Sequence, residues 1–410
     1  MRIVLRVFYK NIHLVGMENI PEKGPVILAA THPNSFMDDV VLGAFLKRNV
    51  IFLARGDVFR KAWAKFLLNA MHVHPIFRGR DTQKEVGKNL NSFTFYRNHL
   101  KKGQTILIHP EGLCVHEKRI RPLKKGMGRI AFDAEEESNW DLGIQIVPIS
   151  LNYTNAPFQG ETLMVQVGRA IAAENYKELY QENPAKAYAQ LAKDVFPVLE
   201  ENGVVQDKGT EEVSEILLTI VRNNESFKHS RIVNRNENPF LLDKNTTEKV
   251  NLLFTHPNWK EYEKVALNFK KNLEYHGLID KTLVGKPKDF SISESIAVPF
   301  ILLWSWPLFL IPRWTEKLIR SIEFRASVLL GIAYLIFGLK ITLFLVLIFM
   351  FIGWWGLLLL PLSLLVAFGA KRIMGMKEER SAYRKWNKLS NDKKQELLEM
   401  RKELVSKLLE

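Results

Sequence analysis

Cysteine is almost absent from this chain, which has 410 residues and a single cysteine, Cys114. One thiol excludes an internal disulfide framework, as expected for a protein that faces a reducing compartment. The sequence also lacks internal repeats, low-complexity tracts and any histidine and cysteine spacing that is typical of a zinc site. We therefore predict a globular protein without a metal site.

Acidic residues are the second shortage, with 44 Asp and Glu against 58 Lys and Arg, a formal net charge of +14. Such a basic excess requires an anionic partner. Nucleic acid is disfavoured, because no zinc pattern, RNA-binding signature or basic region with heptads occurs in the sequence. An anionic membrane surface and a phosphorylated substrate explain the charge better, so we predict membrane lipids as partners and no nucleic acid.

Charge itself is missing from residues 326–370, where Lys340 is the only charged residue. A helix of that length extends about 68 Å, roughly twice the ~30 Å of a hydrocarbon core, so we predict a transmembrane helical hairpin. Residues 296–312 are also apolar but are interrupted by prolines, and a basic stretch follows them over residues 313–325. This pattern favours a re-entrant or interfacial membrane segment over residues 294–325. Residues 371–410 hold twelve basic and seven acidic residues. Their helical spacing predicts an amphipathic tail, which the positive-inside rule places in the cytoplasm.

The first part of the chain alternates apolar, β-rich runs with helix-like segments. This pattern predicts an α/β domain over residues 1–172, with a central mixed sheet flanked by helices, followed by a helical extension over residues 173–293. The predicted strands are Pro25 to Ala30, Val50 to Arg55, His72 to Phe77, Thr105 to Pro110, Ile144 to Tyr153 and Leu163 to Gly168. Three of them lead into polar clusters, which we expect to converge where strands end.

The first of these clusters, "HPNSFMDD", places His32 six residues before Asp38. A carboxylate that holds an imidazole in one tautomer makes it a base able to take a proton from an alcohol. A second interpretation is structural, because a histidine often lies in a loop and an acidic pair often begins a helix. The rest of the sequence has to decide between the two.

Four stretches, taken in chain order, favour the catalytic interpretation. They are "THPNSFMDD" from Thr31, "HPIFRGRD" from His74, "IHPEGLC" from Ile108 leading to "RPLKKGMGRIAF", and "IVPISL" from Ile146. Their order and spacing resemble the four blocks of the glycerolipid acyltransferase family, over roughly residues 10 to 170. The longer histidine-to-aspartate spacing, and the stretch "HPNWKEYEKVALNFKKNLEYHGLIDKTLV", are similar to the glycerol-3-phosphate and dihydroxyacetone-phosphate acyltransferase subgroup.

The resemblance implies an activity and a set of site residues. The family transfers an acyl group from a thioester, acyl-CoA or acyl carrier protein, to a glycerol-phosphate or lysophospholipid hydroxyl without a cofactor. In that scheme His32 is the general base and Asp38 its orienting partner, and Pro148 lies on the acyl-donor side. The positions used for the phosphorylated acceptor are matched by Arg78, Glu111 and Gly112, with Arg80 as a fallback contact. Because both donors are cytosolic, the resemblance implies an integral membrane protein whose catalytic domain faces the cytoplasm.

The sequence departs from the family pattern at two points. Five residues rather than four separate His32 from Asp38, so the loop between them must be irregular if the two are to meet. The stretch "EGLC" lacks the threonine-arginine pair that often follows the glutamate and glycine. Possible substitutes for its phosphate contact are Arg119, Arg121, Lys124 and Lys125. Two alternatives stay open: an acyltransferase for another, amino-acid-based lyso-lipid, and a non-catalytic lipid-binding membrane protein.

Overall fold

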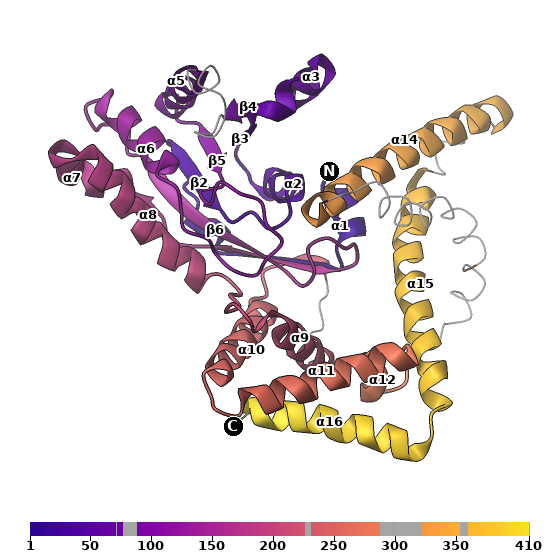
Figure 1. Cartoon of the computed structure of the whole chain (residues 1–410). Coiled ribbons are helices and arrows are strands. Elements are labelled where there is room, and N and C mark those ends of the chain that lie inside the picture. The colour runs from indigo at the N-terminus through magenta and orange to yellow at the C-terminus, as the bar shows by residue number, and fades with distance from the viewer. Residues whose placement is uncertain are drawn as a thin grey trace.

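The computed structural model describes residues 1–70, 72–76, 88–225, 231–287, 298, 321–352 and 360–409. Within these ranges a nine-stranded sheet forms the centre of the molecule, with helices on both faces (Figure 1). The strand order is β4-β3-β5-β2-β6-β7-β1-β9, and β8 pairs with β6. The strands are β1 (Asn11–Val15), β2 (Val26–Ala30), β3 (Val50–Arg55), β4 (Val73–Ile76), β5 (Thr105–Ile108), β6 (Gln145–Tyr153), β7 (Thr162–Val167), β8 (Ile171–Ala172) and β9 (Val233–Asn234).

The sheet is mixed, as predicted. β6 runs antiparallel to β7 and β8, whereas the pairs from β4 across to β6, and those of β1 with β7 and β9, are parallel. The six predicted strands are all present, with bounds within two residues of those expected. The α/β fold class is therefore confirmed. The sequence did not predict β1, β8 and β9.

Side chains of β2 show how the two faces of the sheet are covered. Val26, Leu28 and Ala30 pack into a core shared with α1 (Arg2–Phe8), α2 (Phe36–Phe45) and the start of α14 (Arg325–Ile352). Ile27 and Ala29 point to the opposite face, into a core shared with α5 (Lys88–Lys101), α6 (Gly126–Glu136) and α8 (Pro184–Glu201). All five residues are buried because successive side chains of a strand alternate between its two covered faces.

The remaining helices, apart from α3, follow β8 in the chain. They are α3 (Ala62–Ala70), α7 (Lys177–Glu182), α9 (Glu211–Asn224), α10 (Asn238–Phe254), α11 (Trp259–His276), α12 (Lys281–Val284), α15 (Leu360–Asn387) and α16 (Asn391–Leu409). Short 3-10 turns occur at Met17–Asn19, Gly56–Phe59, Ala173–Tyr176 and Ile322–Phe324.

The C-terminal helix α16 packs against the helical extension rather than standing free (Figure 1). Leu397 and Leu404 are fully buried against α9 and α11. Arg401 also donates to Asp280, with its Nε 2.7 Å from Oδ1. The charged tail expected from the sequence therefore uses its apolar face to complete a helical bundle.

The predicted membrane segments are described only in part. The segment 294–325 lies outside the described residues except for residues 298 and 321–325. The predicted hairpin contains α14 and the start of α15, which point in different directions in Figure 1. Among the helices of the described ranges, none combines the length and the apolar character needed to cross a membrane. The predicted transmembrane hairpin is therefore not supported by these helices.

Candidate active site

The candidate site lies at the carboxyl ends of two neighbouring strands. β2 and β5 are parallel, with Ala29 opposite Ile108. His32 follows β2 and His109 follows β5, so both loops leave the sheet at the same edge. Parallel strands bring their following loops together in this way, and such edges are where open α/β sheets bind ligands.

The loop between His32 and Asp38 is irregular, as the extra residue requires. Ser35 adopts the left-handed region with φ 49°, and α2 begins at the next residue. Asp38 therefore lies in the first turn of α2, facing back toward the loop. Nδ1 of His32 is 3.0 Å from Oδ2 of Asp38, so the contact predicted from the sequence is present.

Asp38 is completely buried, and hydrogen bonds hold its carboxylate in place. The main-chain N–H of Asn34 donates to Oδ2 at 2.8 Å, and the hydroxyl of Tyr153 donates to Oδ1 at 2.6 Å. Because a carboxylate only accepts, the Nδ1 of His32 must carry the proton of their shared bond. The lone pair of a neutral His32 is then on Nε2.

A second histidine, His109, stacks on His32. Their ring centroids are 3.7 Å apart and the rings are nearly parallel, at 13°. Nε2 of His109 lies 3.0 Å from Oδ1 of Asp39, and its Nδ1 lies 3.0 Å from the carbonyl oxygen of Ala30. Burial, the largest influence, would lower the pKa of His109, but the bond and charge of Asp39, the charge of Asp38 and the bond to Ala30 together outweigh burial and raise it. Burial, followed by the charge of His109, lowers the pKa of His32.

Glu111 and Gly112, predicted to contact the acceptor, shape the site's loops. Glu111 is 8% exposed and accepts from the main-chain N–H groups of Arg121, at 3.0 Å, and His32. Burial raises the pKa of its carboxyl group. Gly112 has φ +70°, a conformation that a side chain disfavours. In this structure both residues hold the chain that follows β5 close to His32.

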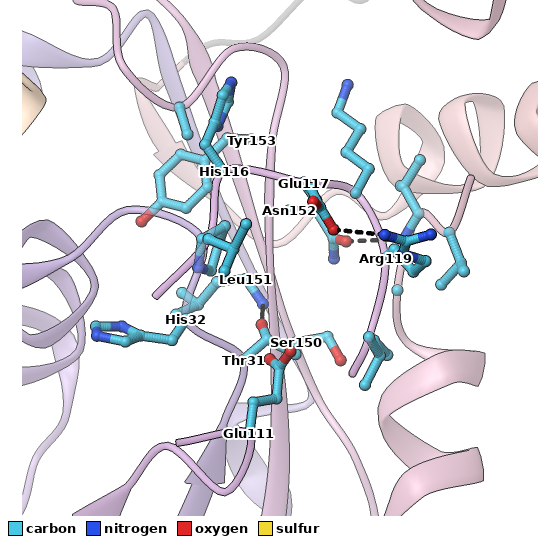
Figure 2. Close-up of a pocket in the computed structure, with 18 of the residues that line it drawn as sticks. Thr31, His32, Glu111, His116, Glu117, Arg119, Ser150, Leu151, Asn152 and Tyr153 are labelled. Atoms are coloured by element: carbon cyan, nitrogen blue, oxygen red, sulfur yellow. Dashed lines mark hydrogen bonds and ion pairs between the residues drawn. The ribbon is translucent and has the colours of Figure 1, made fainter. Parts of the chain in front are cut away.

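A cavity opens beside His32, and its far wall carries the charged segment from Glu117 to Arg121 (Figure 2). Glu117 pairs with Arg119 at 2.9 Å and with Arg121 at 3.0 Å. In Figure 2 the imidazole of His32 points away from the pair of Glu117 and Arg119. The charged segment from Glu117 to Arg121 and the imidazole of His32 therefore lie on different sides of the His32 loop.

The same cavity is also lined by Lys118, whose Nζ lies 2.6 Å from Oε1 of Glu215 on α9. Burial lowers the pKa of Lys118, although Glu215 opposes that shift. Val204, from the segment between α8 and α9, lines it as well. The helical extension thus contributes directly to the surroundings of His32.

Three other predicted site residues, Lys124, Lys125 and Pro148, do not join this cluster. Lys124 and Lys125 are exposed just before α6 and do not line the cavity. Pro148 is buried within β6, where its carbonyl oxygen accepts from the N–H of Gly168 at 2.9 Å. Arg78 and Arg80 lie outside the described residues. Within the described ranges, no group of three or more His, Cys, Asp or Glu side chains is arranged to hold a metal ion.

Sequence reasoning missed three side chains of the site: His109, Asp39 as its partner, and Tyr153. Tyr153 is 115 residues from Asp38, so local spacing gives no sign of their contact. A signal existed for His109, because this polar ring comes directly after the apolar run of β5. A polar ring at an apolar position, next to the sheet edge, was the clue.

Comparisons with known proteins bear on this site. Residues 11–152 match the family model named Acyltransferase. No curated protein matches the chain. Among solved structures, PlsC, the 1-acyl-sn-glycerophosphate (LPA) acyltransferase of Thermotoga maritima, is similar at 16% identity and a TM-score of 0.33, over 45% of this chain and 72% of that one. The matched segment contains β1 to β5, most of β6 and the paired His32 and Asp38. Over residues 11–152, about a third of its length, the chain is therefore similar to the acyltransferase family.

Proposed function

We propose that this protein is a membrane-bound O-acyltransferase that transfers a fatty acyl group from acyl-CoA or acyl carrier protein to a glycerol-phosphate acceptor. The acceptor is glycerol 3-phosphate or its monoacyl derivative, as in early phospholipid synthesis. One observation carries the proposal: His32 is bonded through Nδ1 to an aspartate that is itself fully buried and held by two further donors. That arrangement leaves Nε2 as the proton acceptor.

The proposed reaction begins with the attack of the acceptor hydroxyl on the thioester and ends with the departure of the thiol. Nε2 of His32 takes the proton of the acceptor hydroxyl while the oxygen attacks the thioester carbonyl carbon. The carbon–sulfur bond then breaks, and the thiolate leaves with a proton returned from the imidazolium. Asp38 stabilises that imidazolium and fixes its orientation. General-base help of this kind contributes typically ~10² to 10⁴ in rate.

The acceptor phosphate needs a cationic contact on the side to which the His32 ring points. Arg119 and Arg121 are already paired with Glu117. In Figure 2 the His32 ring points away from Glu117 and Arg119. The resemblance of the block "HPIFRGRD" to the family makes Arg78, with Arg80 as the fallback, the proposed phosphate contact. Arginine suits the role because its planar fork donates two parallel hydrogen bonds to a phosphate.

The start of α14 supports the proposed membrane location. The main-chain N–H of Met37 on α2 donates to Oγ of Ser327 at 3.1 Å, so α14 begins beside the His32 loop. Farther along, Leu335 and Leu339 are 72% and 73% exposed. An apolar helix that starts at the site would let an acyl chain stay in lipid while its thioester reaches His32.

We predict that the protein floats with anionic phospholipid vesicles, and that a Leu335→Glu, Leu339→Glu double variant floats less. Equal flotation would argue against this membrane contact.

The decisive experiment offers purified protein a panel of acceptors with each donor and identifies products by mass spectrometry. The panel includes glycerol 3-phosphate, lysophosphatidate and an amino-acid-based lyso-lipid, so the product also decides between the alternative acceptors. We expect His32→Ala to abolish transfer and Asp38→Asn to reduce it by at least ~10²-fold. His99→Ala, on α5, serves as a matched control and should retain transfer. Full turnover without His32 would end the proposed mechanism.

A further inference from the structure

Each ring nitrogen of His109 faces an oxygen that can only accept a hydrogen bond. Nε2 lies 3.0 Å from a carboxylate oxygen of Asp39, and Nδ1 lies 3.0 Å from the carbonyl oxygen of Ala30. A neutral imidazole has one N–H and could satisfy only one of these acceptors. Both contacts are made when the ring carries two protons, so the geometry indicates an imidazolium at position 109.

That cation lies against the face of His32, with the ring centroids 3.7 Å apart. A positive charge at this distance disfavours a second positive charge on His32. The titratable groups around the two rings come from three elements: Asp38 and Asp39 on α2, Glu111 and Cys114 on the loop after β5, and Tyr153 on β6. The carboxylates of α2 pull His32 toward its protonated form, and His109 opposes them.

We propose that His109, held by Asp39, is a positioning residue that keeps the His32 imidazole neutral and therefore available as a base. Without it, two neighbouring carboxylates would favour an imidazolium at position 32, which has no lone pair to take a proton. This inference rests on the proposed function only in giving His32 the role of base. The effect of the charge of His109 on the protonation of His32 does not depend on the proposed function.

The test uses a readout that does not depend on activity. Deuterium exchange at the imidazole C2–H of each histidine follows that ring's protonation, and peptide mass spectrometry resolves it residue by residue as a function of pH. In the wild-type full-length protein, we expect His109 to titrate at a higher pH than His32. The reverse order overturns the proposal, whether or not any variant folds.

Two variants remove the charge in different ways. His109→Phe keeps an aromatic face against His32, and His109→Gln keeps a neutral donor for Asp39. In both, the exchange midpoint of His32 should move to higher pH. An unchanged or lower midpoint in either folded variant refutes the proposal. His99→Phe is the matched control, since His99 donates to the carbonyl oxygen of Phe95 on α5 and should leave the His32 midpoint in place.

The same variants have a kinetic consequence. On the acid side, kcat/KM of His109→Phe should fall by roughly tenfold relative to wild type, since one pKa unit of charge interaction is a factor of ten in the neutral fraction. The loss should shrink as pH rises. A loss of equal size at every pH would show that His109 has a structural role alone. If the wild type transfers no acyl group but the exchange midpoints behave as expected, the proposed function fails and the charge relation stands.

Discussion

Replacing Tyr153 with phenylalanine tests how strongly the buried carboxylate depends on its donors. The hydroxyl of Tyr153 donates to Oδ1 of Asp38 at 2.6 Å, and the aspartate is fully buried. Tyr153→Phe removes the donor without changing the ring, so water cannot readily replace it. Hydrogen bonds to charged groups contribute about 1.5–3 kcal/mol each, so unfolding should become more favourable by roughly 10- to 150-fold in its equilibrium constant.

Tyr176→Phe is a matched control for Tyr153→Phe. Tyr176 donates to Oδ2 of Asp194, also at 2.6 Å, but that aspartate is only partly buried. In Tyr176→Phe, water can replace the lost donor, and we expect a cost of about 1 kcal/mol or less. Denaturant unfolding followed by tryptophan fluorescence measures both variants. Equal losses of stability would refute the argument that burial decides the cost.

Two further predictions concern charged pairs. Arg401→Met should destabilise the packing of α16 by about 3–5 kcal/mol, because it leaves Asp280 buried without its cation. Lys407→Met breaks an exposed pair with Glu403, and the loss of that pair should cost less than about 1 kcal/mol. Limited proteolysis and denaturant unfolding compare the two. Burial, the largest influence, would raise the pKa of Glu215, but Lys118, Arg222 and Gln206 together outweigh burial and lower it. The stability advantage of wild type over Glu215→Gln should therefore be present above pH 4.5, the group's ordinary pKa, and be lost as pH falls through the lowered folded-state value. Thermal unfolding between pH 3 and 7 measures this advantage, and an advantage that persisted at the acid end would refute the pairing.

Local features of the sequence predicted the sheet well. β2, β3, β5 and β6 are short runs of β-branched and apolar residues between turn signals, and burial on both faces makes such runs easy to recognise. The pairing of His32 with Asp38 was also predictable, because both lie within one loop and one helical turn. In these cases the interactions are set by neighbours in the chain.

The parts that sequence reasoning missed depend on contacts between distant residues. β1 contains His13 in its buried centre, where Nδ1 meets the carbonyl oxygen of Asn236, and a polar residue there hides the strand pattern. The predicted role of Lys124 and Lys125 rested on their nearness in sequence to Glu111, yet the chain turns and leaves both exposed. Spacing alone does not show which way a loop turns.

The charges of the site explain why two carboxylates can stand beside a base. In the proposed mechanism, the resting site sets two carboxylates, Asp38 and Asp39, against one cation, the imidazolium of His109, while His32 is neutral. When His32 takes the hydroxyl proton, the four side chains become electrically balanced. Each histidine then faces one carboxylate, at 3.0 Å in both pairs. In a buried site an uncompensated charge is costly, so gaining a proton reduces the imbalance that the resting site holds. The two carboxylates therefore stabilise the imidazolium that the proposed transfer forms on His32, and the charge of His109 limits how much of that imidazolium is present before the acceptor hydroxyl supplies its proton.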